Sequence, residues 1–282
     1  MFRRLTATAL AVAVVSLVAC GSEDKDSTAQ GGDSCATITP DVLTIGTGSP
    51  AYSPWVENDA PESGEGFEAA VALAVAAELG YEDDAVKWVR TTFDEAIAPG
   101  AKNFDFNLQQ YSITAERSET ISFSDPYYSS NQAIVALTSA NVPEGAITAE
   151  LLAGIKFGVQ AGTTSLDFVN EVIKPSNEVF VYDDNAGAKA ALEAGQIDAI
   201  VVDLPTALYI SYVEIEGTSV IGQFPAAAGG TSDDFGLVFE KDSDLVACVN
   251  TALAAIKASG ALATIEQTWL SDNTGVPVIT LD

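Results

Sequence analysis

The chain has 282 residues, 48% of them apolar, so it is long enough to bury the cores of about two domains. Its 12 Lys and Arg residues stand against 40 Asp and Glu, giving a formal charge of -28. This balance argues against a nucleic-acid partner, because phosphate binding needs clustered cations. The absence of histidine excludes Ser/His and Cys/His triads and His-ligated zinc, and three cysteines cannot form a four-cysteine zinc site. We therefore expect no metal and no cofactor.

Residues 1–19 have the pattern of a secretory signal peptide. Arg3 and Arg4 precede an apolar stretch of h-region length that is short for a membrane-spanning helix. The stretch ends in LVACG, which resembles the lipobox of bacterial lipoproteins and implies lipidation of Cys20 and anchoring at the membrane, outside the cytoplasm. An ordinary cleaved signal, or a membrane anchor with a chance cysteine, is the alternative.

A polar tether at 20–35 separates this segment from the folded part. Its sequence GSEDKDSTAQGGDS offers no apolar residue beyond one alanine and cannot bury a core. Two cysteines remain, Cys35 before the first expected strand and Cys248 within a late helical pattern. Outside the cytoplasm such a pair usually oxidises, which predicts a disulfide; two buried free thiols are the alternative.

From residue 42 onward, runs typical of strands alternate with helical patterns. The expected strands lie at 42–47, 86–89, 104–108, 131–137, 155–160 and 197–203. The expected helices lie at 67–79, 94–98, 148–153, 165–172, 186–194, from Pro205 onward, and over 244–260 and 261–270. This alternation predicts an α/β fold with parallel strands, whose ligand sites lie beyond the carboxyl ends of the strands. No Walker-type loop or GxGxxG motif opens a helix, so nucleotide binding is not expected.

Two of these strand ends suit a carboxylate. Gln109, Gln110 and Ser112 follow the 104–108 strand, and Arg117 lies at the next helical turn. A guanidinium binds a carboxylate through two parallel hydrogen bonds, although most arginines are solvated and pair with a neighbouring acid. Thr163, with Thr164, follows the 155–160 strand and presents hydroxyl and N–H groups.

Two strand ends also have a structural alternative as helix caps. Thr164 or Ser165 can be a helix N-cap, a role that is compatible with ligand binding. Asp203 ends a buried strand, where its carboxylate can pair with an ammonium group or cap the helix from Pro205.

Aromatic side chains follow the first strand. Tyr52 and Trp55 lie in the loop TGSPAYSPW and, with Phe93, can form the walls of a ligand site, or else pack within their own domain. An arginine with hydroxyls, an aspartate and aromatic walls together match the groups of an α-amino acid.

The order of several motifs resembles the polar amino-acid binding family of bacterial extracellular solute-binding proteins. These motifs are YSPW, GFEAAVALAVAAELGY, FDFNLQQYSITAERSETISFSDPYY, GIKFGVQAGTTS and GQIDAIVVD, and the resemblance covers about residues 42 to 271. It implies a type II periplasmic-binding-protein-like fold with two lobes and two hinge crossings. By analogy, lobe 1 contains 36–129 and 227–282, and lobe 2 contains 130–226.

The resemblance also implies a role for each candidate residue. Arg117 would hold the ligand carboxylate with Ser112 and with Thr164 or the backbone beside it. Asp203 would hold the ammonium group with a backbone carbonyl near Gln110. The walls and the surroundings of the ligand side chain would come from Tyr52, Phe93, Gln109, Gln160 and Thr163.

Two departures from the family pattern bear on the ligand. Gln109 and Gln110 stand where small residues are usual, and their carboxamides either narrow the pocket or bind a polar side chain. Gly48 and Ser49 stand where relatives that bind cationic amino acids often have an acid. We therefore expect a polar or acidic amino acid.

The implied function is capture of an amino acid by hinge closure and delivery to the membrane permease of an ABC importer, by a monomeric binding protein that is not an enzyme. One alternative is a dehydratase-type enzyme acting on a small carboxylate, for which Glu57, Glu65 or Asp233 would supply an acid or base. Another alternative is a ligand-sensing module for a receptor.

Overall fold

A computed structural model describes residues 35–140, 147–225, 232–270 and 276–279. By the contacts between its residues, the chain forms two units, 1–30 and 31–282. All described residues belong to the second unit. The predicted signal peptide, Cys20 and the tether up to residue 34 lie outside the described residues.

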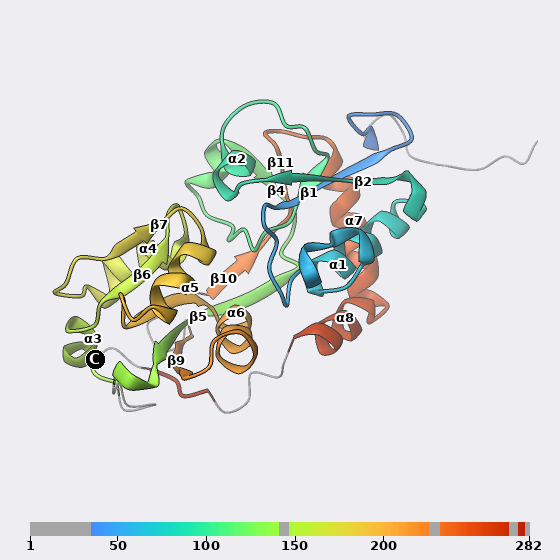
Figure 1. The fold of residues 1–282 in the computed structure, drawn as a ribbon. Helices are drawn as coiled ribbons and strands as arrows, with labels where there is room; N and C mark the ends of the chain where they lie inside the picture. The colour runs from blue at the N-terminus through green and yellow to red at the C-terminus, as the bar shows by residue number, and fades with distance from the viewer. Residues whose placement is uncertain (1–34, 141–146, 226–231, 271–275, 280–282) are drawn as a thin grey trace, which may run out of the picture. The chain divides into compact units, whose positions relative to one another are not determined.

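The first sheet has five strands in the order β2-β1-β3-β11-β4 (Figure 1). Strand β1 is parallel to both β2 and β3, whereas β11 runs antiparallel to β3 and β4. The strands span Leu43–Gly48 (β1), Val86–Thr91 (β2), Phe106–Asn107 (β3), Ile121–Phe123 (β4) and Val238–Glu240 (β11).

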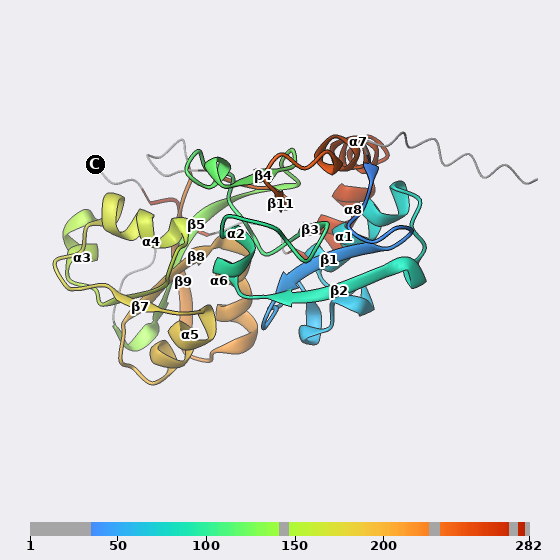
Figure 2. The same cartoon turned by 90° about the horizontal axis from the view of Figure 1, so that it is seen from above.

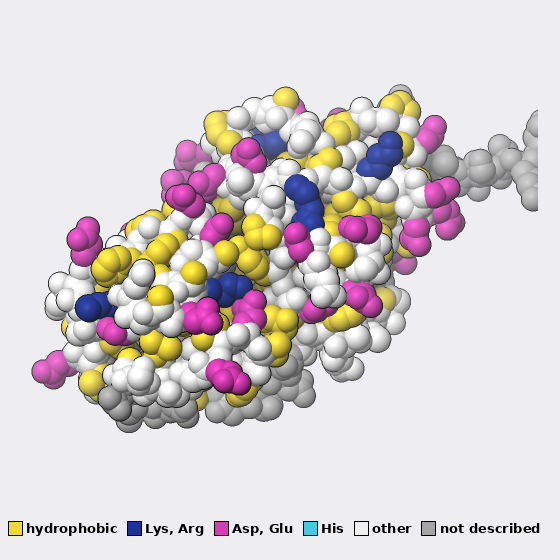
Figure 3. Space-filling view, viewed as in Figure 1, with side chains coloured by type: hydrophobic (Ala, Val, Ile, Leu, Met, Phe, Trp, Pro, Cys, Tyr) yellow, Lys and Arg dark blue, Asp and Glu magenta, His cyan; other side chains and the backbone are white. Residues whose placement is uncertain are grey.

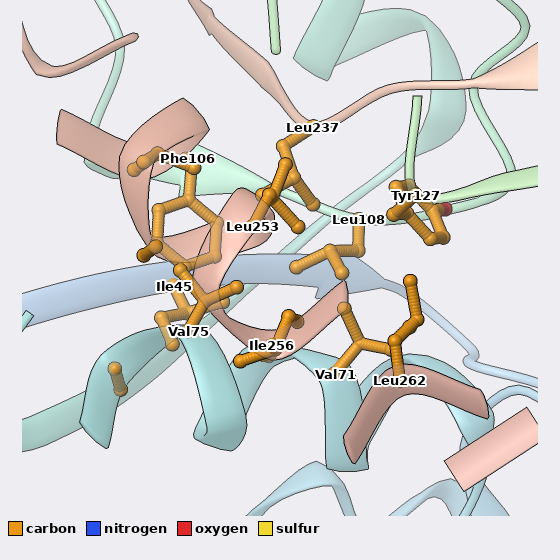
Figure 4. Packing of buried hydrophobic residues seen from close by; sticks show 14 of the residues in the cluster. Ile45, Val71, Val75, Phe106, Leu108, Tyr127, Leu237, Leu253, Ile256 and Leu262 are labelled. Carbon is orange, nitrogen blue, oxygen red and sulfur yellow. The ribbon is translucent and has the colours of Figure 1, made fainter. Parts of the chain in front are cut away.

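Three helices cover one face of this sheet and enclose its core. They are α1 (Phe67–Glu78), α7 (Leu245–Ala258) and α8 (Ala261–Trp269). Figure 4 shows Val71 and Val75 of α1 pointing toward side chains of α7 and of the strands, because apolar residues recur three and four positions apart along each helix. The short helix α2 (Phe93–Ile97) belongs to a separate buried cluster.

The second sheet is mixed, which corrects the expectation of parallel strands throughout. Its order is β10-β5-β8-β6-β7, with β9 also paired to β5. β6 is parallel to β7 and β8, but β5 runs antiparallel to β8, β9 and β10. The strands span Tyr128–Leu137 (β5), Phe157–Gln160 (β6), Phe180–Tyr182 (β7), Ala199–Asp203 (β8), Thr218–Phe224 (β9) and Ser232–Phe235 (β10).

Helices cover both faces of the second sheet. Alternation along β5 sends Ile134 and Ala136 into one core, with residues of α3 and α4, and Ala133 and Val135 into another, with residues of α5 and α6. The four helices span Ala149–Ala153 (α3), Thr164–Phe168 (α4), Asn185–Glu193 (α5) and Leu204–Tyr209 (α6).

Two segments of the chain connect the two sheets. Each sheet and the helices that cover it form one lobe. The chain leaves the first sheet after β4 and enters the second through β5; it returns through β10, which pairs with β5, to β11. Figures 1 and 2 show β5 running from between the two groups of elements into the second group. The structure is therefore a two-lobed α/β fold.

The predicted disulfide is present between Cys35 and Cys248, with the Cα atoms 5.9 Å apart. It joins the first described residue to α7. Within the described part of the chain, no single helix is both long and apolar enough to cross a membrane; the bent pair α7 and α8 meets the criteria jointly, by length and composition alone.

Candidate functional site

All ten residues predicted to contact a ligand line one cavity, to which both lobes contribute. Those from the first lobe follow β1, β2 and β3, and those from the second end β6, follow it or end β8, as expected for a site at the carboxyl ends of strands. The ten are Tyr52, Phe93, Gln109, Gln110, Ser112, Arg117, Gln160, Thr163, Thr164 and Asp203.

Arg117 is held in the cavity by carbonyl oxygens from both lobes. Its Nη1 donates to the Ser112 carbonyl at 2.8 Å and its Nη2 to the Gly162 carbonyl at 2.9 Å, and the guanidinium carbon lies 5.3 Å from the centre of the Phe93 ring. Burial lowers the pKa of Arg117 from its ordinary value. Among the described residues, no Asp or Glu forms an ion pair with it. The remaining N–H groups and the charge are thus available to an anion.

Hydroxyl groups meet across the cavity beside Arg117. The Ser112 Oγ and Thr164 Oγ1 atoms, from different lobes, lie 3.1 Å apart. The N-cap of α4 is Thr163, whose Oγ1 accepts a hydrogen bond from the Leu166 N–H, so the alternative role of Thr164 or Ser165 as the cap of this helix was wrong. The helix begins one residue earlier than predicted because Thr163 has the extended backbone of a cap. Thr164 is consequently free to face Ser112.

Asp203 serves as a helix cap and also lines the cavity. Its Oδ1 accepts from the Thr206 N–H at 3.0 Å and its Oδ2 from the Thr206 hydroxyl at 2.8 Å. The Thr206 hydroxyl in turn accepts a hydrogen bond of 2.7 Å from the Trp55 indole N–H of the first lobe. Burial raises the pKa of Asp203 to about 6. The geometry of Asp203 is therefore compatible with both of its expected roles, as the cap of α6 and as a partner for an ammonium group.

The two neighbouring glutamines are held by different buried groups. The Tyr111 hydroxyl donates to Gln109 Oε1 at 2.9 Å. Gln110 has a left-handed backbone, with φ of 49°, and donates to Glu68 from its N–H at 2.8 Å and from Nε2 at 2.5 Å. The Tyr127 hydroxyl also donates to Glu68, whose pKa is raised to about 7 by burial.

The aromatic walls are only partly as expected. Tyr52 and Phe93 line the cavity, and the Phe93 ring lies 4.7 Å from that of Tyr111. Trp55 does not line it: only 1% of this residue is exposed, and its ring packs edge-on against Phe67. The Trp55 ring belongs to the core of the first lobe because the tight turn from Tyr52 folds it inward.

Some lining residues were not predicted. Gln132, in the middle of β5, donates to Asp233 at 2.6 Å and accepts from the Ser165 hydroxyl at 2.7 Å. Its place at the end of the polar run 129–132, directly before the apolar run 133–137 of the same strand, was the available signal. The six lining residues that were missed are Gln132, Ser165, Asn185, Val201, Val202 and Phe235.

The acids considered for an enzyme do not form a catalytic set in the cavity. Glu57, Glu65 and Asp233 are absent from its lining; Glu57 accepts from the Ser53 hydroxyl, and Asp233 is bonded to Gln132. Within the described residues, no group of three or more Cys, Asp or Glu side chains is arranged to hold a metal ion.

Comparison with known proteins gives a consistent family. A model of bacterial extracellular solute-binding proteins, family 3, matches residues 43–272. The L-cystine-binding protein TcyJ of Escherichia coli (strain K12) is 31% identical over 208 residues, which cover 72% of this chain and 73% of that protein. A probable histidine-binding protein of Campylobacter jejuni is 28% identical over 267 residues, covering 92% and 95% of the two chains.

Solved structures share the fold. An ancestral arginine-binding protein bound to glutamine has a TM-score of 0.68 and 29% identity, with 83% of this chain and all of that chain covered. The family and the named relatives are binding proteins rather than enzymes. The chain belongs to family 3 of the bacterial extracellular solute-binding proteins.

Proposed function

We propose that the protein is the extracytoplasmic substrate-binding component of an ABC importer and that it captures a free α-amino acid with a polar or acidic side chain. One observation carries the proposal: a guanidinium without a carboxylate partner among the described residues and the half-buried carboxylate of Asp203 line the same cavity. Burying either charge alone is costly, and an α-amino acid supplies a partner to both.

The cavity contacts support capture by closure. Lobe 1, proposed as 36–129 with 227–282, supplies Arg117 and Ser112, and lobe 2, proposed as 130–226, supplies Thr164 and Asp203. A ligand that contacts both lobes binds the closed arrangement better than an open one and shifts the population toward it. The closed, monomeric protein then delivers the amino acid to the membrane permease.

The sequence supports a location at the outer side of the membrane. The signal-peptide pattern of residues 1–19 and the lipobox at Cys20 indicate a lipid-anchored protein on the tether at 20–35. The surface fits a protein that does not adhere to anionic headgroups, because acidic side chains are spread over the face in Figure 3 with few basic ones among them.

A thermal-shift screen of the twenty amino acids tests the proposal, followed by calorimetry on the tightest binder. Arg117→Ala should weaken binding at least about 100-fold, since removing one partner of a buried charged contact costs about 3 to 5 kcal/mol. The control is Lys87→Ala, an exposed cation on β2 outside the cavity, which should leave the affinity unchanged. Unchanged affinity in Arg117→Ala, or no amino acid bound at all, would refute the proposed function.

A further inference from the structure

Among the residues that the structure describes, the cavity lining contains one charged group of each sign, Arg117 and Asp203. The α-carboxylate and the α-ammonium of an amino acid occupy both. Two further carboxylates lie behind the lining, but Glu68 already accepts three hydrogen bonds and Asp233 accepts one from Gln132. A charged ligand side chain would therefore be buried without its own counter-charge, which is unfavourable.

Gln109 lines this cavity, and a buried neighbour fixes the orientation of its carboxamide. Its Oε1 accepts from Tyr111, which is 0% exposed, and Tyr111 keeps its proton because burial raises the pKa of the hydroxyl well above its ordinary value. Reversing the amide would take this acceptor at 2.9 Å away from the Tyr111 hydroxyl, whose contact with the Phe93 carbonyl is longer, at 3.5 Å. The Gln109 oxygen is thus committed, and its Nε2 has no hydrogen-bond partner among the residues that the structure describes.

Gly48, the last residue of β1, leaves room for this amide. A Cβ atom on Gly48 would lie 2.8 Å from Gln109 Nε2, closer than real Cβ contacts allow. The side chain of Gln109 therefore occupies the space that a side chain at position 48 would take.

Gln110 is held by Glu68. Its backbone N–H and one of its two Nε2 hydrogens are donated to Glu68, so its carboxamide oxygen and the second Nε2 hydrogen remain. The buried Glu68 also lies near Asp203, whose charge contributes to raising the pKa of Glu68. Gln110 thus adds an acceptor near the residue assigned to the ammonium group, whereas Gln109 supplies a donor elsewhere in the lining.

We propose that Gln109, fixed by Tyr111, is a specificity-determining residue that selects an amino acid whose side chain is neutral and carries a hydrogen-bond acceptor, namely an amide or a hydroxyl. The inference rests on the proposed function and narrows it. It assigns the preference to one N–H donor and to the lack of a further unpaired charge in the lining. Acidic and cationic side chains are both disfavoured, and apolar ones leave the donor unsatisfied.

Calorimetry on the mature chain with three matched ligand series tests this selectivity. The series are glutamine, glutamate, methionine and lysine; asparagine, aspartate and leucine; and serine with alanine. In the series that binds most tightly, the neutral acceptor-bearing member should bind about tenfold more tightly than the others. Gln109→Met, which keeps the length but removes the amide, should abolish that preference.

Two further variants separate the role of the amide from a general loss of structure. Gln109→Glu replaces the donor by an acceptor and should weaken the amide or hydroxyl ligand at least about tenfold while improving lysine relative to it. Gln196→Glu makes the same chemical change at an exposed position outside the cavity and should change nothing. Tyr111→Phe leaves Gln109 in place but unfixed, so the preference should shrink in a protein that still unfolds cooperatively.

The outcomes distinguish this inference from the proposed function. If wild-type protein binds an amino acid through Arg117 but prefers a charged or apolar member, or if Gln109→Met keeps the preference, the selectivity assigned to Gln109 is wrong and the transport proposal stands. If no amino acid binds, both fail.

Discussion

The carboxyl group of Glu68 makes a measurable contribution to stability that depends on pH. It lies in the first turn of α1, is 2% exposed, and accepts hydrogen bonds from Gln110 and Tyr127. Burial raises its pKa from the ordinary value of 4.5 to about 7, because desolvation outweighs the three hydrogen bonds that favour the ionised form. Glu68→Gln removes the titration and retains the shape.

The sign of the effect follows from where the proton binds. Between pH 4.5 and 7 the folded protein holds a proton on Glu68 that the unfolded chain has released, so this group favours folding as the pH falls. Its stabilising effect is lost as the pH rises through 7. The interval between the two pKa values corresponds to about 3 kcal/mol. Wild-type protein should therefore lose about 3 kcal/mol of unfolding free energy between pH 4.5 and 8 that Glu68→Gln does not lose.

Urea denaturation of the ligand-free protein at several pH values measures this difference. All other titrating groups are shared, so the difference between wild type and variant isolates Glu68. Glu78→Gln, at an exposed position near the other end of α1, is the matched control and should run parallel to wild type. If Glu68→Gln also runs parallel to wild type across the whole range, the buried acid does not titrate near pH 7 and the reasoning is refuted.

Three other predictions concern the site and its supports. Replacing both Cys35 and Cys248 by serine should lower the unfolding free energy by up to about 5 kcal/mol, because the bridge closes a loop with a sequence separation of 213; denaturation with and without reductant checks this. Trp55→Phe should weaken amino-acid binding about fivefold in calorimetry, since it removes the hydrogen bond to Thr206 that joins the lobes, and unaltered affinity would contradict this role. Because Asp203 must be ionised to hold an ammonium group and its pKa is about 6 without ligand, affinity should be constant above pH 7 and fall below about pH 6; a flat profile down to pH 4.5 would exclude that pairing.

Elements with strong local periodicity were predictable from the sequence. The helix expected at 67–79 is observed as α1 (Phe67–Glu78), and Gly80 follows it with φ of 87°, as a helix stop requires. The strand expected at 42–47 is observed as β1, one residue later. In both cases the pattern depends only on neighbours along the chain.

Elements that depend on distant partners were not predictable. β9 (Thr218–Phe224) includes Gly222 and Gln223 and lacks a strand pattern; it forms because the edge of β5 offers hydrogen bonds. The antiparallel direction of β5 leaves no trace in its own apolar run, since burial on both faces produces the same composition in either direction.

The residues of the site also fall into those that the sequence predicted and those that only the fold brings together. The residues at strand ends were found because the carboxyl ends of strands converge. Gln132 was missed since it lies within a strand, and Glu68 because an acid in the first turn of a helix usually interacts with the helix dipole at the surface. Only the fold brings Gln110 and Tyr127 to it and reveals it as buried.

The composition of the chain gives the environment of Arg117 its significance. With 40 acidic residues against 12 basic ones, carboxylates are abundant, and Arg90, Lys189 and Lys241 each form an ion pair. Arg117 is half-buried. In the described part of the chain, its guanidinium contacts two carbonyl oxygens and the Phe93 ring and forms no ion pair. Carbonyl dipoles orient a guanidinium without neutralising it, so its attraction for an anion is retained. An acid-rich protein whose half-buried Arg117 forms no ion pair among the described residues has a cavity suited to accept a carboxylate from outside.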